Sequence, residues 1–116
     1  MKILVVEDHL LLGDSLRLYL PALRKTWTVR VAETRGVALD LLCEEPFDAV
    51  VLDLMLPDAP DLVMLLADTR RAHPSPKRIV IASAHDDAEA LALTFGCVTI
   101  RKPYDIAALI AALETP

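Results

Sequence analysis

Five short apolar runs, spread along the whole chain, constrain the possible fold more than any other feature of the sequence. They are rich in Val and Ile. Longer segments lie between them, and in these segments Leu, Ile and Ala recur three and four residues apart. The runs are KILVV (2–6), TVRVA (28–32), AVVLDL (49–54), RIVIAS (78–83) and VTIR (98–101). Near-continuous apolar strands that alternate with helices are typical of a parallel sheet covered on both faces. We therefore predict a three-layer α/β fold of five parallel strands and five helices, connected by right-handed crossovers.

Segments with helical periodicity fill the intervals between the runs and follow the last of them. The predicted helices lie within residues 10–23, 34–46, 61–73, 86–96 and 105–114. Thr34 and Asp86 are suited to cap helix starts, and Gly96 is suited to a helix end. Pro21 falls late in the first pattern, where it removes a backbone hydrogen bond, so we expect the first helix to kink or end there.

Size and charge exclude several classes of function. A chain of 116 residues predicts one domain over residues 1–116, and its 54% hydrophobic and 25% charged residues are typical of a globular protein. The net charge of -5 disfavours direct binding of nucleic acid, and no apolar run reaches membrane-spanning length. Cys43 and Cys97 form no metal-ligand pattern, so we expect them to fill the core in a reducing, cytoplasmic compartment.

Carboxylates follow two of the predicted strands. Glu7 and Asp8 come after the first run, and Asp53 lies at the end of the third. The functional crevice of an open parallel sheet lies at the carboxyl ends of the strands, so the three acids meet there if these strands are neighbours. Two ionised carboxylates about 5 Å apart repel by roughly 3 kcal/mol at an effective dielectric constant near 20. A cation is therefore expected among them, and oxygen ligands of this kind favour Mg²⁺.

Two more polar residues are predicted at the same edge of the sheet. Ser83 ends the fourth run, and Lys102 follows the fifth. A nucleophilic carboxylate, a divalent ion, a lysine and a hydroxyl group together are the parts needed for phosphoryl transfer onto Asp53, which would give an aspartyl phosphate. This interpretation explains why a carboxylate ends an otherwise apolar run: it is placed there to be modified.

The motifs ILVVEDH, AVVLDLMLPD, IVIASA and RKPYD resemble, in order and spacing, those of the response regulator receiver domain of two-component signalling. The resemblance covers essentially the whole chain. It implies a flavodoxin-like doubly wound sheet with the strand order 2-1-3-4-5, and it implies that Asp53 is the phosphoacceptor. It also implies that the bond between Lys102 and Pro103 is a cis peptide.

The resemblance assigns roles to the other site residues. It implies that Glu7, Asp8, Asp53 and the main-chain carbonyl of Met55 help to hold Mg²⁺. It further implies that Ser83 and Lys102 contact the phosphoryl group.

The implied function is signalling. The domain would take phosphate from a histidine kinase or a histidine phosphotransfer protein onto Asp53, and the modification would change which partner binds. Its chemistry would be limited to self-phosphorylation and slow self-dephosphorylation, so we do not expect an enzyme. A pseudo-receiver that works as a phosphorylation-independent interaction module is the alternative. A flavodoxin-like cofactor binder would need a phosphate loop after the first strand, where this chain has the acidic stretch EDHLLLGD.

Two positions depart from the pattern of the family. Asp61 occupies the place of a usual glycine and Pro60 precedes it, so we expect an unusual path for the loop after Asp53. Thr99 occupies the place of the usual switch aromatic, so we do not expect a rotating ring to relay the signal. Tyr104 is interpreted as a packing residue at the start of the last helix.

The first and last helices carry many apolar residues. Leu10 and Leu11 open the first helix, and the last has an apolar stripe with alanines over much of its remaining surface. The stripe consists of Ile106, Leu109, Ile110 and Leu113. We expect either ordinary core packing or a partner or homodimer face, formed by the first and last helices or by the fourth and last helices.

Overall fold

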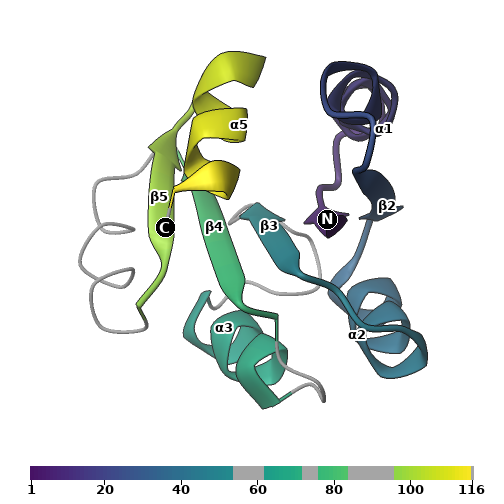
Figure 1. The fold of residues 1–116 in the computed structure, drawn as a ribbon. Coiled ribbons are helices and arrows are strands. Elements are labelled where there is room, and N and C mark those ends of the chain that lie inside the picture. The colour runs from purple at the N-terminus through teal and green to yellow at the C-terminus, as the bar shows by residue number, and fades with distance from the viewer. Residues whose placement is uncertain (54–61, 72–75, 84–95, 116) are drawn as a thin grey trace.

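Five parallel strands lie side by side in the order β2-β1-β3-β4-β5 in the computed structural model of this chain (Figure 1). The structure describes residues 1–53, 62–71, 76–83 and 96–115. The strands are β1 (Lys2–Val6), β2 (Thr28–Ala32), β3 (Ala49–Asp53), β4 (Arg78–Ser83) and β5 (Val98–Arg101). The predicted parallel sheet and its strand order are both confirmed.

Four helices fall within the described residues, where five were expected along the whole chain. They are α1 (Leu10–Leu23), α2 (Arg35–Glu44), α3 (Leu62–Arg71) and α5 (Ile106–Glu114). The helix predicted for residues 86–96, with its cap at Asp86, lies outside the described residues except for Gly96. That glycine has a φ of 68°, in the left-handed region where a residue without a Cβ is favoured.

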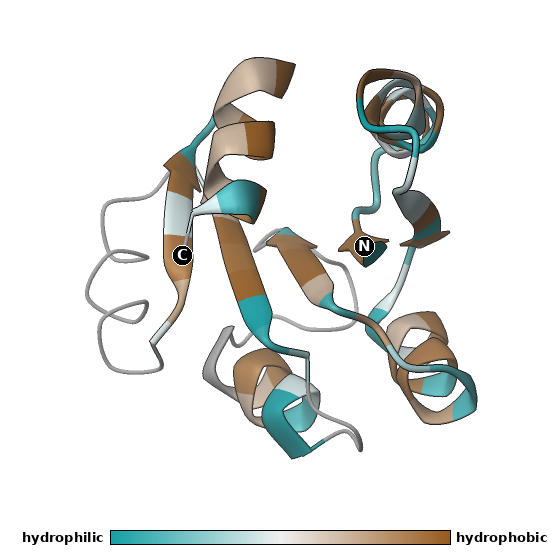
Figure 2. Ribbon diagram, in the orientation of Figure 1, coloured by the Kyte–Doolittle hydropathy of each residue, from teal (hydrophilic) through white to brown (hydrophobic). Residues whose placement is uncertain are grey.

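Two layers of helices cover the sheet, with α1 and α5 on one face and α2 and α3 on the other (Figure 1). Alternate residues of each strand supply the two cores, because successive side chains point to opposite faces. In β1, Ile3 and Val5 pack on the side of α1 and α5, whereas Leu4 and Val6 pack on the side of α2 and α3. Each such buried aliphatic side chain contributes roughly 1.5–3 kcal/mol to folding. Figure 2 shows the strands as predominantly hydrophobic ribbon between the two helical layers.

Short polar side chains fix where the helices begin. The hydroxyl of Thr34 accepts a hydrogen bond from the backbone N–H of Val37 at 3.2 Å, which confirms the predicted cap. Asp105 caps α5 in the same way, accepting from the N–H of Ala108 at 2.8 Å. Caps of this kind stabilise a helix by about 1 kcal/mol.

Expectations about two residues need correction. The first helix does not end at Pro21 but continues to Leu23, since the proline removes a single backbone hydrogen bond; the alternative, a kink at Pro21, stays a prediction. Cys43 is exposed rather than in the core, because it faces away from the buried side of α2. Cys97 is half-buried and packs against the core on the side of α2 and α3.

The apolar surface of α5 is used mostly for core packing, whereas α1 leaves apolar side chains in solvent. Leu109, Ile110 and Leu113 are buried, so the stripe of the last helix covers the sheet. Leu11 and Leu18 of α1 are 75% and 67% exposed. None of the helices within the described residues combines the length and the apolar character that a membrane crossing requires.

Close packing of α1 on β2 gives a test of the fold. A Cβ atom at Gly13 would lie 2.9 Å from Cγ1 of Val31, which is shorter than real Cβ contacts. We expect Gly13→Ala to lower the free energy of unfolding by about 1 kcal/mol, because overpacking costs roughly 1–3 kcal/mol and outweighs the gain of about 1 kcal/mol in helix propensity. Chemical denaturation monitored by circular dichroism measures this difference.

Gly36 provides the matched control. A Cβ atom there would have only the Thr34 hydroxyl nearby, at 3.9 Å, so Gly36→Ala should leave stability unchanged or raise it. In a Val31→Ala background the cost of Gly13→Ala should disappear, because the clashing methyl group is gone. Equal effects of the two glycine substitutions would contradict this account of the α1 and β2 contact.

Candidate functional site

Strand register brings two of the predicted acids side by side. The pairing of β1 with β3 places Val6 opposite Leu52. The next residue in each case is an acid: Glu7 directly follows β1, and Asp53 is the last residue of β3. Alternation along the strands turns both acids toward the face covered by α1 and α5, since Val5 and Val51 pack on that face. The two carboxylates therefore meet because β1 and β3 are neighbours in the correct register.

A cluster of three acids forms at this edge of the sheet. Carboxylate oxygens of Glu7, Asp8 and Asp53 all lie within 4.8 Å of one another. Glu7 and Asp53 are 3% and 2% exposed, whereas Asp8 is exposed to solvent. The prediction that these three acids converge is confirmed. Carboxylate oxygens are the hard ligands that a divalent cation such as Mg²⁺ prefers, and Mg²⁺ keeps several waters to complete its octahedral coordination, so the residues fit a metal of this kind.

Lys102 supplies positive charge to the two buried acids. Its Nζ lies 2.8 Å from Oδ2 of Asp53 and 3.6 Å from Oε2 of Glu7. Its backbone N–H donates to the carbonyl of Ser83 at 2.9 Å, which joins the end of β4 to the segment that carries the lysine. The bond between Lys102 and Pro103 is cis, as expected. One ammonium group cannot balance three carboxylates, so the cluster retains an excess of negative charge.

This excess changes the acidity of Glu7. Burial, together with the hydrogen bond and the negative charge of Asp53, raises the pKa of Glu7 to about 8, against the opposing effect of Lys102. The backbone N–H of His9 also donates to Oε1 of Glu7 at 3.1 Å, which favours the ionised form. Without a divalent cation, a proton on Glu7 therefore relieves part of the repulsion at neutral pH.

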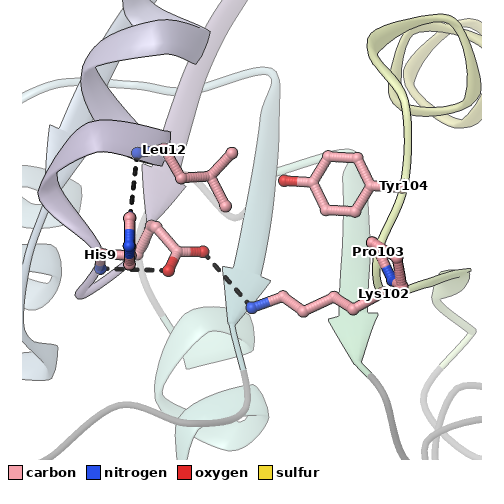
Figure 3. A pocket seen from close by; sticks show the side chains of 6 residues that line it. His9, Leu12, Lys102, Pro103 and Tyr104 are labelled. Atoms are coloured by element: carbon pink, nitrogen blue, oxygen red, sulfur yellow. Dashed lines mark hydrogen bonds and ion pairs between the residues drawn. The ribbon is translucent and has the colours of Figure 1, made fainter.

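A pocket of about 430 Å³ opens beside the acids, between the start of α1 and the segment that precedes α5 (Figure 3). Its lining residues are Glu7, His9, Leu12, Lys102, Pro103 and Tyr104. In Figure 3 the hydroxyl end of Tyr104 and the side chain of Leu12 point toward each other across this space. The sequence did not predict this pocket: Tyr104 is interpreted there as a packing residue, and Tyr104 does pack against the core on the side of α1 and α5.

The chemistry of two pocket residues is set by their surroundings. Burial, with the negative charges of Glu7 and Asp53, raises the pKa of Tyr104 to about 12, so its hydroxyl stays protonated. His9 caps α1: its Nδ1 accepts a hydrogen bond from the backbone N–H of Leu12 at 3.2 Å. The position of Tyr104 directly after the Lys102 and Pro103 pair is the sequence signal that could have placed it near the site.

The remaining predicted residues are placed with less detail. Ser83 ends β4 and is buried, at 5% exposed, on the strand that neighbours β3. Thr99 lies within β5 and is half-buried. Met55, and the departures at Pro60 and Asp61, lie outside the described residues, so the expected metal contact of the Met55 carbonyl stays a prediction.

A family profile and the relatives found by sequence comparison agree on the same family. The profile of the response regulator receiver domain matches residues 3–114. Response regulator ArlR of Staphylococcus epidermidis is 31% identical over 114 residues, which cover 97% of this chain and 51% of that protein. Sensory transduction protein LytT of Bacillus cereus is 29% identical over 115 residues, which cover 98% of this chain and 46% of that protein. The chain thus spans about half the length of these relatives.

Solved structures agree on the fold. A CheY-like response regulator receiver domain protein from Methanospirillum hungatei has a TM-score of 0.84 at 23% identity, with 97% of this chain and 90% of that chain covered. A response regulator from Burkholderia pseudomallei, solved with a phosphorylated aspartic acid, calcium ion and citrate, has a TM-score of 0.81 at 26% identity. In that comparison 98% of this chain and 66% of the other are covered.

The raised pKa of Glu7 predicts how stability depends on pH without divalent cations. Between the ordinary value of 4.5 and the folded value of about 8, the folded state binds more protons than the unfolded state. The free energy of unfolding should therefore fall as pH rises through this window, by at most about 1.4 kcal/mol per pH unit from this group. Glu7→Gln should flatten that part of the slope, as measured by urea denaturation at a series of pH values in chelator-treated buffer.

Glu114 is the control for this titration. It is an exposed glutamate whose pKa is lowered by a hydrogen bond and ion pair with Arg24, so it is ionised throughout the window. Glu114→Gln should keep the slope of the wild type. A slope that survives in Glu7→Gln would show that another group titrates.

Proposed function

The chain belongs to the response regulator receiver domain family, and on this premise we propose that Asp53 accepts a phosphoryl group from a phosphohistidine donor, aided by Mg²⁺. The observation that carries the proposal is the contact of Lys102 Nζ with Asp53 Oδ2 at 2.8 Å inside a cluster of three acids. A lysine ammonium beside a buried carboxylate is positioned to pair with phosphoryl oxygens once they arrive. Membership of this family suggests that the donor is a histidine kinase or a histidine phosphotransfer protein.

Each described site residue has a distinct task in this reaction. A carboxylate oxygen of Asp53 is the nucleophile, and burial among strands holds it in one orientation. Lys102 moves its positive charge from Asp53 to the incoming phosphoryl oxygens, where charge is spread in the transition state. Ser83, at the end of the neighbouring strand, is assigned to hydrogen-bond the transferred group.

Mg²⁺ would be held by Glu7, Asp8 and Asp53, with the Met55 carbonyl as a further proposed ligand outside the described residues. When bound, the ion neutralises the acids and attracts phosphoryl oxygens. Asp8 is the exposed member of the cluster, so it offers an oxygen on the side open to solvent. Glu7 must give up its proton to join the site, because only the ionised carboxylate balances a divalent charge.

Phosphorylation of Asp53 would shift the balance between two conformations of the domain and so change which partner binds. Its proposed chemistry is limited to self-phosphorylation and slow self-dephosphorylation, which is the chemistry of a switch rather than of an enzyme. With Thr99 in β5, the proposed relay does not use a rotating aromatic ring at that position. The cytoplasm is the proposed location. We also propose that α1 offers a homodimer or partner face, which the exposed side chains of Leu11 and Leu18 support. The alternative face would use the helix predicted within residues 86–96, which lies outside the described residues except for Gly96.

Intact mass spectrometry tests the phosphoacceptor. With Mg²⁺ and a small phosphodonor, the wild type should gain the mass of one phosphoryl group, and Asp53→Asn should gain none because an amide is not a comparable nucleophile. Asp40→Asn, which removes an exposed acid of α2, should behave like the wild type. A wild type that gains no mass with several donors would support the pseudo-receiver alternative instead.

Calorimetric titration tests the metal site. Mg²⁺ should bind with an affinity that rises with pH toward the pKa of Glu7, and binding should release protons. Glu7→Gln and Asp8→Asn should each weaken binding by at least about tenfold, the loss typical even of an outer-shell partner. Asp14→Asn, an exposed α1 acid paired with Arg17, should retain the wild-type affinity. Equal affinities in all four proteins would place the ion elsewhere.

A further inference from the structure

The turn between β1 and α1 carries two of the three acids, and hydrogen bonds hold it closed. The backbone N–H of Glu7 donates to the carbonyl of Ala32 in β2 at 2.9 Å, so the first residue of the turn is fixed to the sheet. Two residues later, the backbone N–H of His9 donates to Oε1 of Glu7 at 3.1 Å. Asp8 lies between the two residues that this bond joins. The bond therefore limits how far the exposed acid of the cluster can move.

His9 is also the residue that caps α1. Its Nδ1 accepts a hydrogen bond from the backbone N–H of Leu12 at 3.2 Å (Figure 3), and its carbonyl accepts from the N–H of Gly13 at 3.0 Å. Its backbone is extended, with a φ of -85° and a ψ of 106°, as is usual for a residue that caps a helix start. One residue thus joins the first turn of the helix to the carboxylate of Glu7.

Both oxygens of Glu7 are engaged by this arrangement. Oε1 accepts from the N–H of His9, and Oε2 lies 3.6 Å from Nζ of Lys102, so the carboxylate is held from two sides. Burial and Asp53 raise the pKa of Glu7, whereas Lys102 and the N–H of His9 oppose them and favour the ionised carboxylate. Only that form can share a divalent cation with Asp8 and Asp53. A turn that opens would lose the His9 donor, and an ion that binds would have to close the turn again.

We propose that His9 is a positioning residue for the metal site: by capping α1, it holds the turn from Glu7 to His9 in the closed form that binds Mg²⁺. The inference rests on the proposed function, because it concerns the ion that this function requires. When only a fraction of the molecules has the competent form, the apparent affinity falls by that fraction. The cap and the ion favour the same form of the turn, so each should strengthen the other.

Two substitutions at His9 separate the cap from the imidazole ring. His9→Ala and His9→Ser both remove the ring, but only serine keeps a side-chain oxygen that can accept from the N–H of Leu12. In calorimetric titrations with Mg²⁺, His9→Ala should weaken binding by about three- to fivefold, the equilibrium constant of a typical helix cap. His9→Ser should bind within about twofold of the wild type, because the cap is restored.

Thr34 provides the matched control. It caps α2, on the opposite face of the sheet, by accepting from the N–H of Val37 at the same distance of 3.2 Å. Thr34→Ala should lower the free energy of unfolding as His9→Ala does, yet keep the wild-type affinity for Mg²⁺. Wild-type affinity in His9→Ala, an equal loss in Thr34→Ala, or no recovery in His9→Ser would overturn the inference while leaving phosphorylation of Asp53 intact. A wild type that binds no Mg²⁺ would instead overturn the proposed metal site.

Hydrogen exchange tests the same coupling on the wild type alone. The N–H of Leu12 exchanges with solvent when its bond to the cap opens, as does the N–H of Val37 at the start of α2. A saturating concentration of Mg²⁺ should slow exchange at Leu12 by about three- to fivefold, because linkage between two equilibria is reciprocal. Exchange at Val37 should keep its rate. An unchanged rate at Leu12, or equal slowing at both amides, would show that the ion does not act on the cap of α1.

Discussion

Repulsion among three carboxylates is the interaction on which the site depends. Glu7, Asp8 and Asp53 bring ligand oxygens within 4.8 Å of one another, and each ionised pair costs about 3 kcal/mol at an effective dielectric constant near 20. Lys102 balances part of this charge, mainly at Asp53. The rest is balanced by a proton, as the raised pKa of Glu7 indicates, or by a divalent cation. The same deficit makes the site receptive to an ion that attracts phosphoryl oxygens.

The sheet is what keeps the acids together despite this repulsion. Strands β1 and β3 are buried on both faces, and their pairing in register leaves no freedom for Glu7 and Asp53 to separate. The hydrophobic cores on the two faces of the sheet supply the favourable free energy that offsets the electrostatic cost. Functional sites commonly carry local destabilisation of this kind, which the surrounding packing supports. Here one of the two acids that the sheet holds together, Asp53, is the group proposed to react.

The second wall of the site comes from the far end of the chain. Lys102 and Tyr104 reach the acids from the segment between β5 and α5, while His9 and Leu12 reach the same place from the start of α1. Lys102 has a charge that complements the phosphoacceptor, and Tyr104 presents a neutral aromatic wall because its pKa is raised to about 12. A charged half and an apolar half thus lie side by side at this edge of the sheet.

The sequence by itself determined the fold and the members of the charged cluster. Short continuous apolar runs and helical periodicity are local properties, so all five strands were located from the sequence, and the meeting of the acids followed from the rule that the carboxyl ends of parallel strands share one edge. Only the tertiary structure decided that Glu7 is buried and Asp8 exposed, because strand register turns one toward the face of α1 and α5 and leaves the other in solvent. It alone also brought Leu12 opposite Tyr104, since residues so distant in sequence meet only through the packing of whole elements.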